Sequence, residues 1–201
     1  MPNVHGNSVF DTESQPRKDC LNFLIIGAGA RGNAYAAALT QSASSVSTRI
    51  GAIAEPIISK RNAFERKYVR KHETCQLFDT WQAYVEFEKG RQRRTIDGVF
   101  VCTLDELHAE IITALAPLGL HIMSEKPLAT TLSDCLRIYR SLQPPGTGSP
   151  QAIFSIGHVL RYSPHNILLR KLLLDGVIGD VLSIEHTEPV GWWHFSHSYV
   201  R

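Results

Sequence analysis

Short apolar runs alternate along the chain with longer stretches in which apolar residues recur at helical spacing. The runs predict strands at Leu21–Ile26, Arg49–Ala54, Cys75–Phe78, Gly98–Cys102, His121–Ser124 and Ala152–Ile156. The stretches between them predict helices at Arg31–Gln41, Pro56–Lys71, Trp81–Glu88, Glu106–Leu118 and Ser133–Leu142. This alternating order predicts an α/β fold built on a doubly wound parallel sheet.

The alternation is interrupted at residues 143–150, where Pro, Gly and Ser gather in a stretch that continues neither a helix nor a strand. We interpret it as the linker between a domain at residues 21–150 and a segment at residues 151–201. The polar residues 1–20 are expected to form a disordered tail. The last segment is expected to add the sixth strand and the start of a truncated, incomplete α+β domain. Its further elements are a helix at Pro164–Leu174 and a strand at Val181–His186.

The composition is typical of a globular protein: 43% of the 201 residues are hydrophobic, 20% are charged, and the formal net charge is +2. This balance does not point to a nucleic acid or an anionic membrane as a partner. No apolar run approaches the roughly 20 residues that cross a bilayer, and the polar start lacks the apolar core of a signal peptide. We therefore expect a cytoplasmic protein.

The cysteines are widely spaced and form no Cys-x-x-Cys pair or zinc-binding pattern with histidine. They are Cys20, Cys75, Cys102 and Cys135. Cys102 lies in an apolar run, where a buried thiol is expected rather than a nucleophile. The pattern predicts reduced structural thiols and no metal site.

The first predicted strand is followed by the letters GAGARG, which open the first helix. A Gly-x-Gly-x-x-Gly motif in this position is typical of dinucleotide binding. Gly27 permits a tight turn, Gly29 leaves room for a pyrophosphate, and Gly32 lets the helix pack closely. Backbone N–H groups at the helix start, which includes Ala30 and Arg31, then meet the anion. The alternative is that the glycines only shape the turn.

Glu55 lies 23 residues after Gly32, at the end of the second predicted strand. A carboxylate there can accept hydrogen bonds from an adenosine ribose and would repel a 2′-phosphate. Glu55 therefore favours NAD over NADP, although Arg31 can supply a compensating positive charge. The alternative for Glu55 is a solvated strand end.

A second motif, Glu125-Lys126-Pro127, follows the fifth predicted strand, at the edge of a parallel sheet where ligands bind. Removal of a hydride from a carbinol carbon builds carbonyl character, and a positioned cation or proton relay stabilises the oxygen. Lys126 is therefore the candidate catalytic residue. The alternative is an ordinary exposed lysine.

From residue 21 to about residue 201 the chain resembles the Gfo/Idh/MocA oxidoreductase family, sugar and inositol dehydrogenases among them, whose hallmark is Glu-Lys-Pro after the fifth strand. Other motifs agree in order: Ala54-Glu55-Pro56, Cys102-Thr103-Leu104-Asp105 with His108, and Gly157-His158 with Arg161-Tyr162. The resemblance implies an NAD(P)-binding Rossmann domain. It also implies hydride transfer between NAD(P) and a carbinol carbon of a sugar, polyol or similar substrate. Thr103, Leu104 and His108 would then border the nicotinamide.

The same resemblance implies that Lys126 hydrogen-bonds the substrate hydroxyl and helps to relay its proton. Glu125 and Pro127 would set the geometry of this lysine, with a Lys126-Pro127 peptide that is often cis in the family. His158 and Arg161 are the substrate-side candidates by position.

Family members continue into a large, mostly antiparallel sheet domain, which residues 151–201 are too few to complete. His194 and His197 are three residues apart, so helical spacing would bring them together. Because no third ligand is present and Trp192 and Trp193 are neighbours, we expect a packing segment rather than a metal or catalytic pair.

Two other interpretations stay open. One is a non-catalytic dinucleotide-sensing or regulatory protein, as the related galactose-pathway repressor is. Apolar surface around Trp192 and Trp193 would suit a protein partner or a homo-oligomer. The other is a truncated, inactive remnant. Dependence of NADH production on Lys126 discriminates the enzyme from the regulatory protein.

Overall fold

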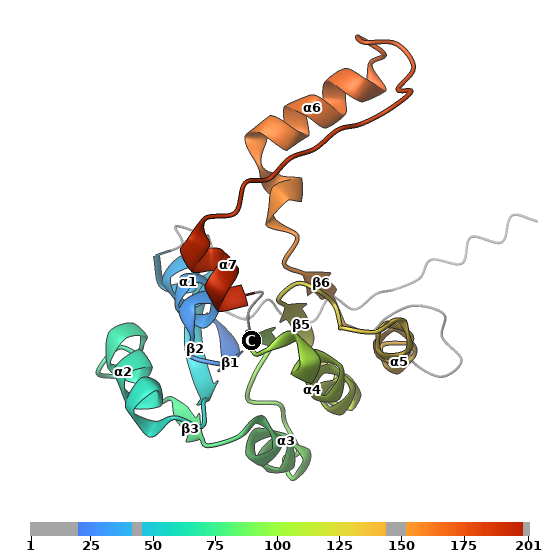
Figure 1. Cartoon of the computed structure of the whole chain (residues 1–201). Helices are drawn as coiled ribbons and strands as arrows, with labels where there is room; N and C mark the ends of the chain where they lie inside the picture. Colours follow the sequence, from blue (N-terminus) through green and yellow to red (C-terminus); the bar gives the residue numbers. More distant parts are fainter. Residues whose placement is uncertain (1–19, 42–45, 144–151, 199–201) are drawn as a thin grey trace, which may run out of the picture. The chain divides into compact units, whose positions relative to one another are not determined.

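The computed structural model describes residues 20–41, 46–143 and 152–198. Within these ranges six parallel strands form one sheet in the order β3-β2-β1-β4-β5-β6 (Figure 1). The strands are β1 (Cys20–Ile26), β2 (Ser47–Ala54), β3 (Gln76–Phe78), β4 (Gly98–Val101), β5 (His121–Ser124) and β6 (Phe154–Ile156). This is the strand order of the Rossmann fold, in which the chain reverses direction across the sheet at a switch point between β1 and β4. The predicted doubly wound parallel sheet is confirmed.

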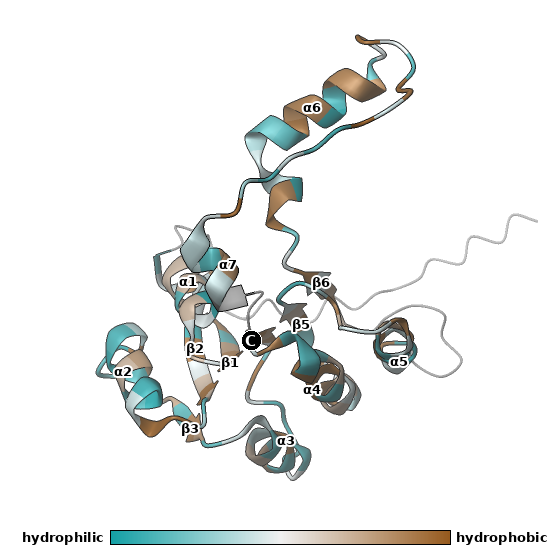
Figure 2. Ribbon diagram, viewed as in Figure 1, coloured by the Kyte–Doolittle hydropathy of each residue, from teal (hydrophilic) through white to brown (hydrophobic). Residues whose placement is uncertain are grey.

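Helices cover both faces of the sheet (Figure 1). The α-helices of this part are α1 (Ala30–Gln41), α2 (Ile58–Tyr68), α3 (Trp81–Lys89), α4 (His108–Leu115) and α5 (Leu132–Ser141). The buried hydrophobic residues of α1 and α2 belong to one core cluster, and those of α3, α4 and α5 belong to another. Each covering helix carries both apolar and polar residues (Figure 2), as expected for a helix with one buried face.

Consecutive residues of β1 contribute to opposite faces of the sheet. Leu24 and Ile26 belong to the core under α3, α4 and α5, whereas Ile25 belongs to the core under α1 and α2. All three side chains are buried. A strand that is buried on both faces reads as a continuous apolar run, which is the pattern in the sequence.

Two predicted helices differ from the structure by more than a shift of one residue at an end. The helix predicted at Pro56–Lys71 is α2, which ends at Tyr68 because Val69 adopts an extended backbone with φ −98°. The helix predicted at Glu106–Leu118 is divided into η1 (Asp105–Leu107), α4 and η2 (Ala116–Leu118). Pro117 has no N–H to continue the α-helical hydrogen bonds, and Gly119, with φ 65°, ends the turn.

β6 extends the sheet past the boundary predicted at residue 150, since Phe154 pairs with Ile122 of β5. The predicted tail lies outside the described residues except for Cys20, which begins β1. The predicted linker also lies outside them, apart from its first residue, Gln143.

Residues 158–201 form a second compact unit, separate from residues 1–157. Its described part holds η3 (Val159–Tyr162), α6 (Pro164–Leu174) and α7 (Trp192–Ser198). The helix predicted at Pro164–Leu174 is therefore confirmed as α6. No residue of α6 is buried.

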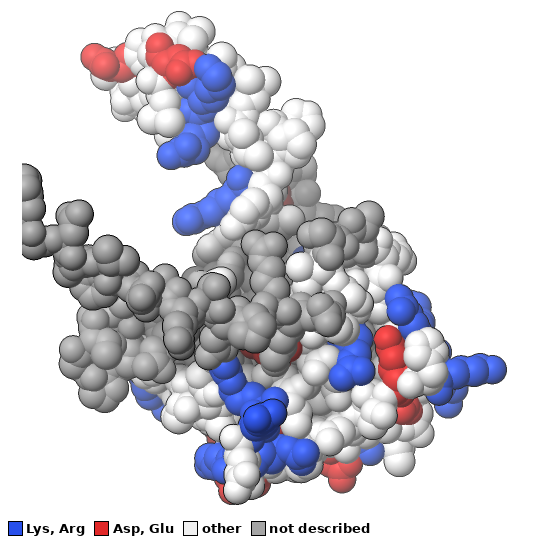
Figure 3. All heavy atoms as spheres, turned by 180° about the vertical axis from the view of Figure 1, so that it is seen from behind, with Lys and Arg blue, Asp and Glu red and all other residues white. Residues whose placement is uncertain are grey.

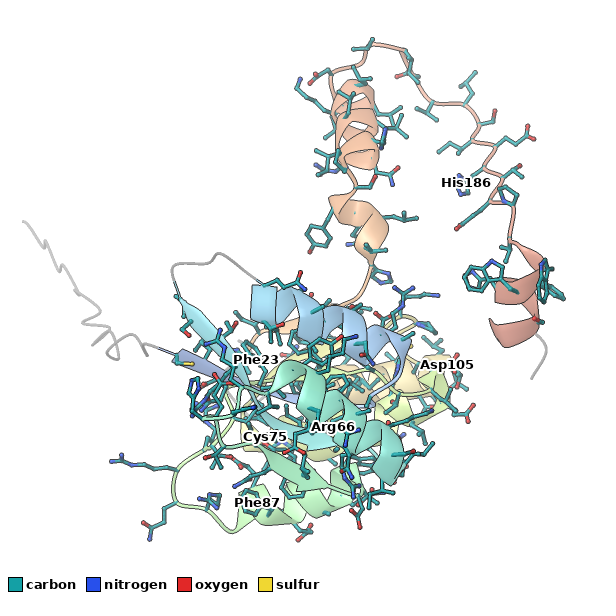
Figure 4. The ribbon with its side chains drawn as sticks, turned by 90° about the vertical axis from the view of Figure 1, so that its left-hand side faces the viewer. Phe23, Arg66, Cys75, Phe87, Asp105 and His186 are labelled. Atoms are coloured by element: carbon teal, nitrogen blue, oxygen red, sulfur yellow. The ribbon has the colours of Figure 1, made fainter. Side chains whose placement is uncertain are left out.

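The strand predicted at Val181–His186 is wrong, because this segment forms no strand. Its side chains project from an extended backbone around His186 (Figure 4), and Leu182 is 96% exposed. A strand needs a neighbour that pairs with its backbone groups, and the described part of this unit contains no strand that could do so. The apolar pattern of residues 181–186 was therefore not sufficient to predict a strand.

On the face drawn in Figure 3, basic and acidic side chains are interspersed rather than separated into large fields of one sign. This distribution agrees with the formal net charge of +2. Among the described residues, no helix combines the length and the apolar character that crossing a membrane requires.

Candidate functional site

The glycine turn between β1 and α1 is built by contacts that exclude side chains. Gly27 has φ 94°, and its N–H donates to the carbonyl oxygen of Ala54 at 2.9 Å. A Cβ atom at Gly27 would stand 2.7 Å from the carbonyl oxygen of Cys102, and one at Gly32 would stand 2.1 Å from the carbonyl oxygen of Gly27. Both positions therefore require glycine to keep the turn against its neighbours.

Gly29 differs from the other two glycines, because a Cβ atom built on it would have no neighbour within 4 Å. The space beside Gly29 is open, as a site for an approaching phosphate must be. The Asn33 side chain donates to the carbonyl oxygens of Ala28 and Gly29 at 3.1 and 2.9 Å, so these oxygens have protein partners. α1 starts at Ala30 and has no acidic residue in its first turn, so its N-terminal N–H groups suit an anion. The exposed Arg31 lies in the same turn.

Glu55 stands at the end of β2 beside the glycine turn and is 6% exposed. Its carboxylate accepts the N–H of Ala28 at 2.8 Å and the N–H of Ile57 at 3.0 Å. Arg61 donates to the carbonyl oxygen of Glu55 at 2.7 Å and forms an ion pair with Asp79 at 2.9 Å. The solvated strand end that was the alternative for Glu55 is thus wrong, since the carboxylate is buried and holds the turn.

Lys126 follows β5 and is exposed, whereas Glu125 before it is 8% exposed. The Tyr35 hydroxyl, from α1, donates to Glu125 Oε1 at 2.7 Å. Glu125 Oε2 accepts the backbone N–H of Lys126 at 3.3 Å. The Lys126-Pro127 peptide is cis, as the resemblance implied.

His108 contacts Pro127, the residue that follows Lys126. The ring is 1% exposed, and its Nδ1 lies 2.9 Å from the carbonyl oxygen of Pro127. Its Nε2 lies 3.4 Å from the carbonyl oxygen of Thr103. A neutral imidazole donates from one nitrogen only, and the shorter distance favours donation from Nδ1 to Pro127. His108 thereby connects the loop after β4 to the segment after β5.

Cys75, before β3, and Cys102, after β4, are poor nucleophiles. Burial, together with the charge of Glu125, raises the pKa of Cys102 to about 12. Burial, with smaller contributions from Glu65 and Glu73, raises the pKa of Cys75 to about 12. Both thiols therefore stay protonated near neutral pH, as the prediction of structural thiols requires.

Backbone hydrogen bonds bring the predicted motifs to one edge of the sheet. The N–H of Cys102 donates to Ile26 at 2.8 Å, and the N–H of Glu125 donates to Val101 at 2.9 Å. The loops after β1, β4 and β5 therefore start side by side, at the carboxyl edge where a Rossmann fold binds its ligand. The predicted residues in these loops and in the first turns of the helices α1 and α4 are Gly27, Gly29, Ala30, Arg31, Gly32, Thr103, Leu104, His108, Glu125, Lys126 and Pro127.

The remaining candidates belong to the second unit. His158 and Arg161 are exposed residues of the second unit, so their substrate role stays a prediction. His194 lies in α7, as does His197, whose side chain is outside the described residues. No group of three or more His, Cys, Asp or Glu among the described residues could hold a metal ion.

Sequence reasoning missed three residues that build this site: Tyr35, Asn33 and Arg61. Tyr35 is the one aromatic residue in the alanine-rich letters ARGNAYAAALTQ of α1, which is the signal that could have found it. Asn33 and Arg61 donate hydrogen bonds to backbone carbonyl oxygens, and no spacing in the sequence predicts such partners.

Comparison with known proteins agrees with this geometry. Residues 21–146 match the family described as "Oxidoreductase family, NAD-binding Rossmann fold". A 2,7-anhydro-N-acetylneuraminate hydratase of Mediterraneibacter gnavus is 35% identical over 100 residues, which are 50% of this chain and 25% of the relative. An inositol 2-dehydrogenase of Rhizobium meliloti is 27% identical over 166 residues, which are 80% of this chain and 43% of the relative.

Among solved structures, a levoglucosan dehydrogenase in complex with NADH and levoglucosan superposes with TM-score 0.65 and 25% identity. The match covers 81% of this chain and 41% of that one. The chain thus spans less than half the length of these relatives. The family match covers most of the chain and coincides with the strand order and the glycine turn. The chain belongs to the Gfo/Idh/MocA oxidoreductase family and carries its NAD-binding Rossmann domain.

Proposed function

We propose that this chain binds NAD and forms the cofactor half of a dehydrogenase that moves a hydride between NAD and a carbinol carbon of a sugar, polyol or similar substrate. One observation carries the proposal: Lys126 follows β5 at the sheet edge that also carries the open glycine turn. Glu125 bonds to its backbone N–H, and His108 contacts the carbonyl oxygen of the following Pro127. Relatives named for inositol, xylose and levoglucosan support a small polyhydroxylated substrate.

For the cofactor, the pyrophosphate would lie over Gly29 and the first N–H groups of α1. NAD is favoured over NADP because the buried Glu55 carboxylate faces the glycine turn, where a 2′-phosphate would meet its charge. Arg31, exposed in the same turn, is the residue that would oppose this preference. Thr103 and Leu104 would border the nicotinamide end, with His108 as their support.

The nicotinamide supplies the hydride acceptor when it is bound. The Lys126 Nζ would hydrogen-bond the substrate hydroxyl and, as a neutral amine, accept its proton and pass it on to solvent as carbonyl character develops. Glu125 and Pro127 would hold this lysine in place, and His158 and Arg161 stay the candidates for substrate contacts. These residues require no resident metal ion for their roles.

A non-catalytic dinucleotide-sensing protein is the second candidate. The observation that favours it is the exposure of large apolar side chains in the second unit, where Trp192 is 81% exposed and Trp193 is 65% exposed. Such a surface suits a protein partner or a second copy of the chain.

Calorimetric titration of the full chain with NAD and with NADP tests the cofactor, with size exclusion to confirm a defined mass. We expect saturable NAD binding that is tighter than NADP binding. A polyol screen for NADH production then compares the wild type with Lys126→Ala. Loss of turnover in Lys126→Ala at unchanged NAD affinity supports the enzyme. Equal, negligible turnover in both proteins supports the sensing protein, and absence of NAD binding by a well-folded chain would contradict both.

A further inference from the structure

Tyr35 connects the helix of the glycine turn to the residue before Lys126. It lies on α1, 90 positions before Glu125, and its hydroxyl donates to Glu125 Oε1 at 2.7 Å. The Tyr35 ring also packs against Phe100 of β4, with ring centroids 5.0 Å apart. Packing against Phe100 restricts the orientation of the Tyr35 ring, so the hydroxyl is directed toward Glu125.

The Glu125 carboxylate joins this hydroxyl to the backbone of Lys126. Oε1 accepts from Tyr35, and Oε2 accepts from the Lys126 N–H at 3.3 Å. Glu125 is 8% exposed, and among the described residues it forms no ion pair within 4.0 Å. A buried carboxylate needs donors, and here a phenol and a backbone amide are the donors.

Gly157 provides the space for this pair at the end of the first unit. A Cβ atom on Gly157 would lie 3.0 Å from the Tyr35 hydroxyl and 3.2 Å from Glu125 Oε1. The Gly157 N–H donates to Ser124 at 2.8 Å, which fixes the backbone beside the pair. A side chain at this position would press on the two atoms that form the hydrogen bond.

The protonation states of the surroundings suit a permanent hydrogen bond. Burial, followed by the hydrogen bond to Glu125 and its charge, raises the pKa of Tyr35 far above the ordinary tyrosine value. Burial and Glu125 also raise the pKa of Cys102 to about 12. The Tyr35 hydroxyl thus stays a donor. Near neutral pH, no Cys102 thiolate competes with the Glu125 carboxylate for its hydrogen bond.

We propose that Tyr35 is a positioning residue: its hydroxyl fixes the Glu125 carboxylate, Glu125 holds the backbone of Lys126, and Gly157 leaves the room that this arrangement needs. The consequence for catalysis rests on the proposed function of Lys126. The positioning itself does not, so the two can be tested separately.

The first test is hydrogen exchange of the Lys126 amide in the full chain, measured by NMR in Tyr35→Phe. Tyr84→Phe is the matched control, because the buried Tyr84 hydroxyl has no hydrogen-bond partner among the described residues. We expect Lys126 exchange to accelerate about tenfold in Tyr35→Phe and to stay at the wild-type rate in Tyr84→Phe. Gly157→Ala should accelerate it in the same way. Equal Lys126 exchange in Tyr35→Phe and Tyr84→Phe would overturn the proposal.

A second readout is one that a merely structural role would not move. In Glu125→Gln the charged acceptor of the Tyr35 hydroxyl is absent, so the ring Cζ shift of Tyr35 at neutral pH, which reports donation by the hydroxyl, should move toward that of an ordinary tyrosine. An unchanged Tyr35 Cζ shift in Glu125→Gln would mean that the two groups are not coupled, and would overturn the proposal.

Turnover separates this inference from the proposed function. We expect kcat to fall about tenfold in Tyr35→Phe while the KM for NAD stays within about twofold, because positioning and not binding is lost. If Lys126→Ala keeps full turnover, the proposed function fails, and the amide exchange of Lys126 and the ring carbon shift of Tyr35 still decide the role of Tyr35. If Lys126→Ala is inactive and Tyr35→Phe keeps the wild-type kcat, the positioning role fails alone.

Discussion

The Glu55 carboxylate accepts the backbone N–H of Ala28 at 2.8 Å, so the acid at the end of β2 and the glycine turn after β1 form one unit. The second carboxylate oxygen takes the N–H of Ile57 at 3.0 Å, which fixes the side chain at the start of α2. Any ribose hydroxyl that Glu55 binds would therefore meet an acceptor that is already oriented.

Replacing Glu55 with Gln should weaken NAD binding and narrow the preference for NAD over NADP. The amide removes the charge and leaves one backbone N–H without its carboxylate acceptor, so we expect the Kd for NAD to rise about tenfold. Calorimetric titration with both dinucleotides measures the ratio of the Kd for NADP to the Kd for NAD. Glu86→Gln is the control, because Glu86 is an exposed residue that pairs with Lys89 on the surface. An unchanged ratio in Glu55→Gln would remove Glu55 from cofactor selection.

Substitutions at Gly29 and Gly32 of the glycine turn should affect binding and folding separately. Gly32→Ala places a Cβ atom 2.1 Å from the carbonyl oxygen of Gly27, so the free energy of unfolding should fall by about 3 kcal/mol. Gly29→Ala meets no protein atom within 4 Å, so stability should change by less than about 0.5 kcal/mol. Its methyl group instead occupies the open side of the turn, and the Kd for NAD should rise by about tenfold or more.

Urea denaturation and NAD titration of Gly32→Ala and Gly29→Ala check this pair of predictions. Full NAD affinity in Gly29→Ala would show that the open space beside Gly29 is not the pyrophosphate site.

The stability of the first unit should decline at alkaline pH. The pKa values of Cys75 and Cys102 are raised from 9.0 to about 12, so the folded state favours the neutral thiols. The contribution of the neutral thiols to the free energy of unfolding is fully present below pH 9 and is lost as the pH rises toward 12. From the size of the pKa shifts, it amounts to a few kcal/mol. Urea midpoints at intervals from pH 8 to pH 11 measure it. Cys75→Ala should reduce the slope, and a flat wild-type profile would contradict the assignment.

The second unit should exchange its amide hydrogens far faster than the sheet. No residue of α6 is buried, whereas Leu24 and Ile25 of β1 are 0% exposed. Local opening is easiest where few apolar contacts hold an element, so α6 amides should show protection factors below about 10. Hydrogen exchange of the full chain compares the two units, with dilution to detect self-association. Strong protection of α6 that disappears on dilution would show that a second copy covers it.

Much of the first unit could be predicted from the sequence. The run Gly98–Cys102 and the alternation around it predicted β4, because a central strand buried on both faces is apolar throughout. The spacing of Gly27, Gly29 and Gly32 predicted the turn, since steric exclusion acts within a few residues and is therefore visible as local sequence.

The site needed more than local sequence. Tyr35 and Glu125 are 90 positions apart, and His108 and Pro127 are 19 apart, so no pattern connects the partners. The strand predicted at Val181–His186 failed for the opposite reason. An apolar pattern permits a strand there, but the described part of that unit offers no neighbour to complete it.

The sequence by itself determined the elements of the first unit, the glycine turn and the place of Lys126 after a strand, because these depend on local sterics and hydrophobic periodicity. Only the tertiary structure decided that Glu55 is buried against the turn, and that Tyr35 and His108 hold the residues on either side of Lys126. These contacts form when parallel strands bring distant loops to one edge of the sheet, and the order of the strands, not the spacing of residues, sets which loops meet.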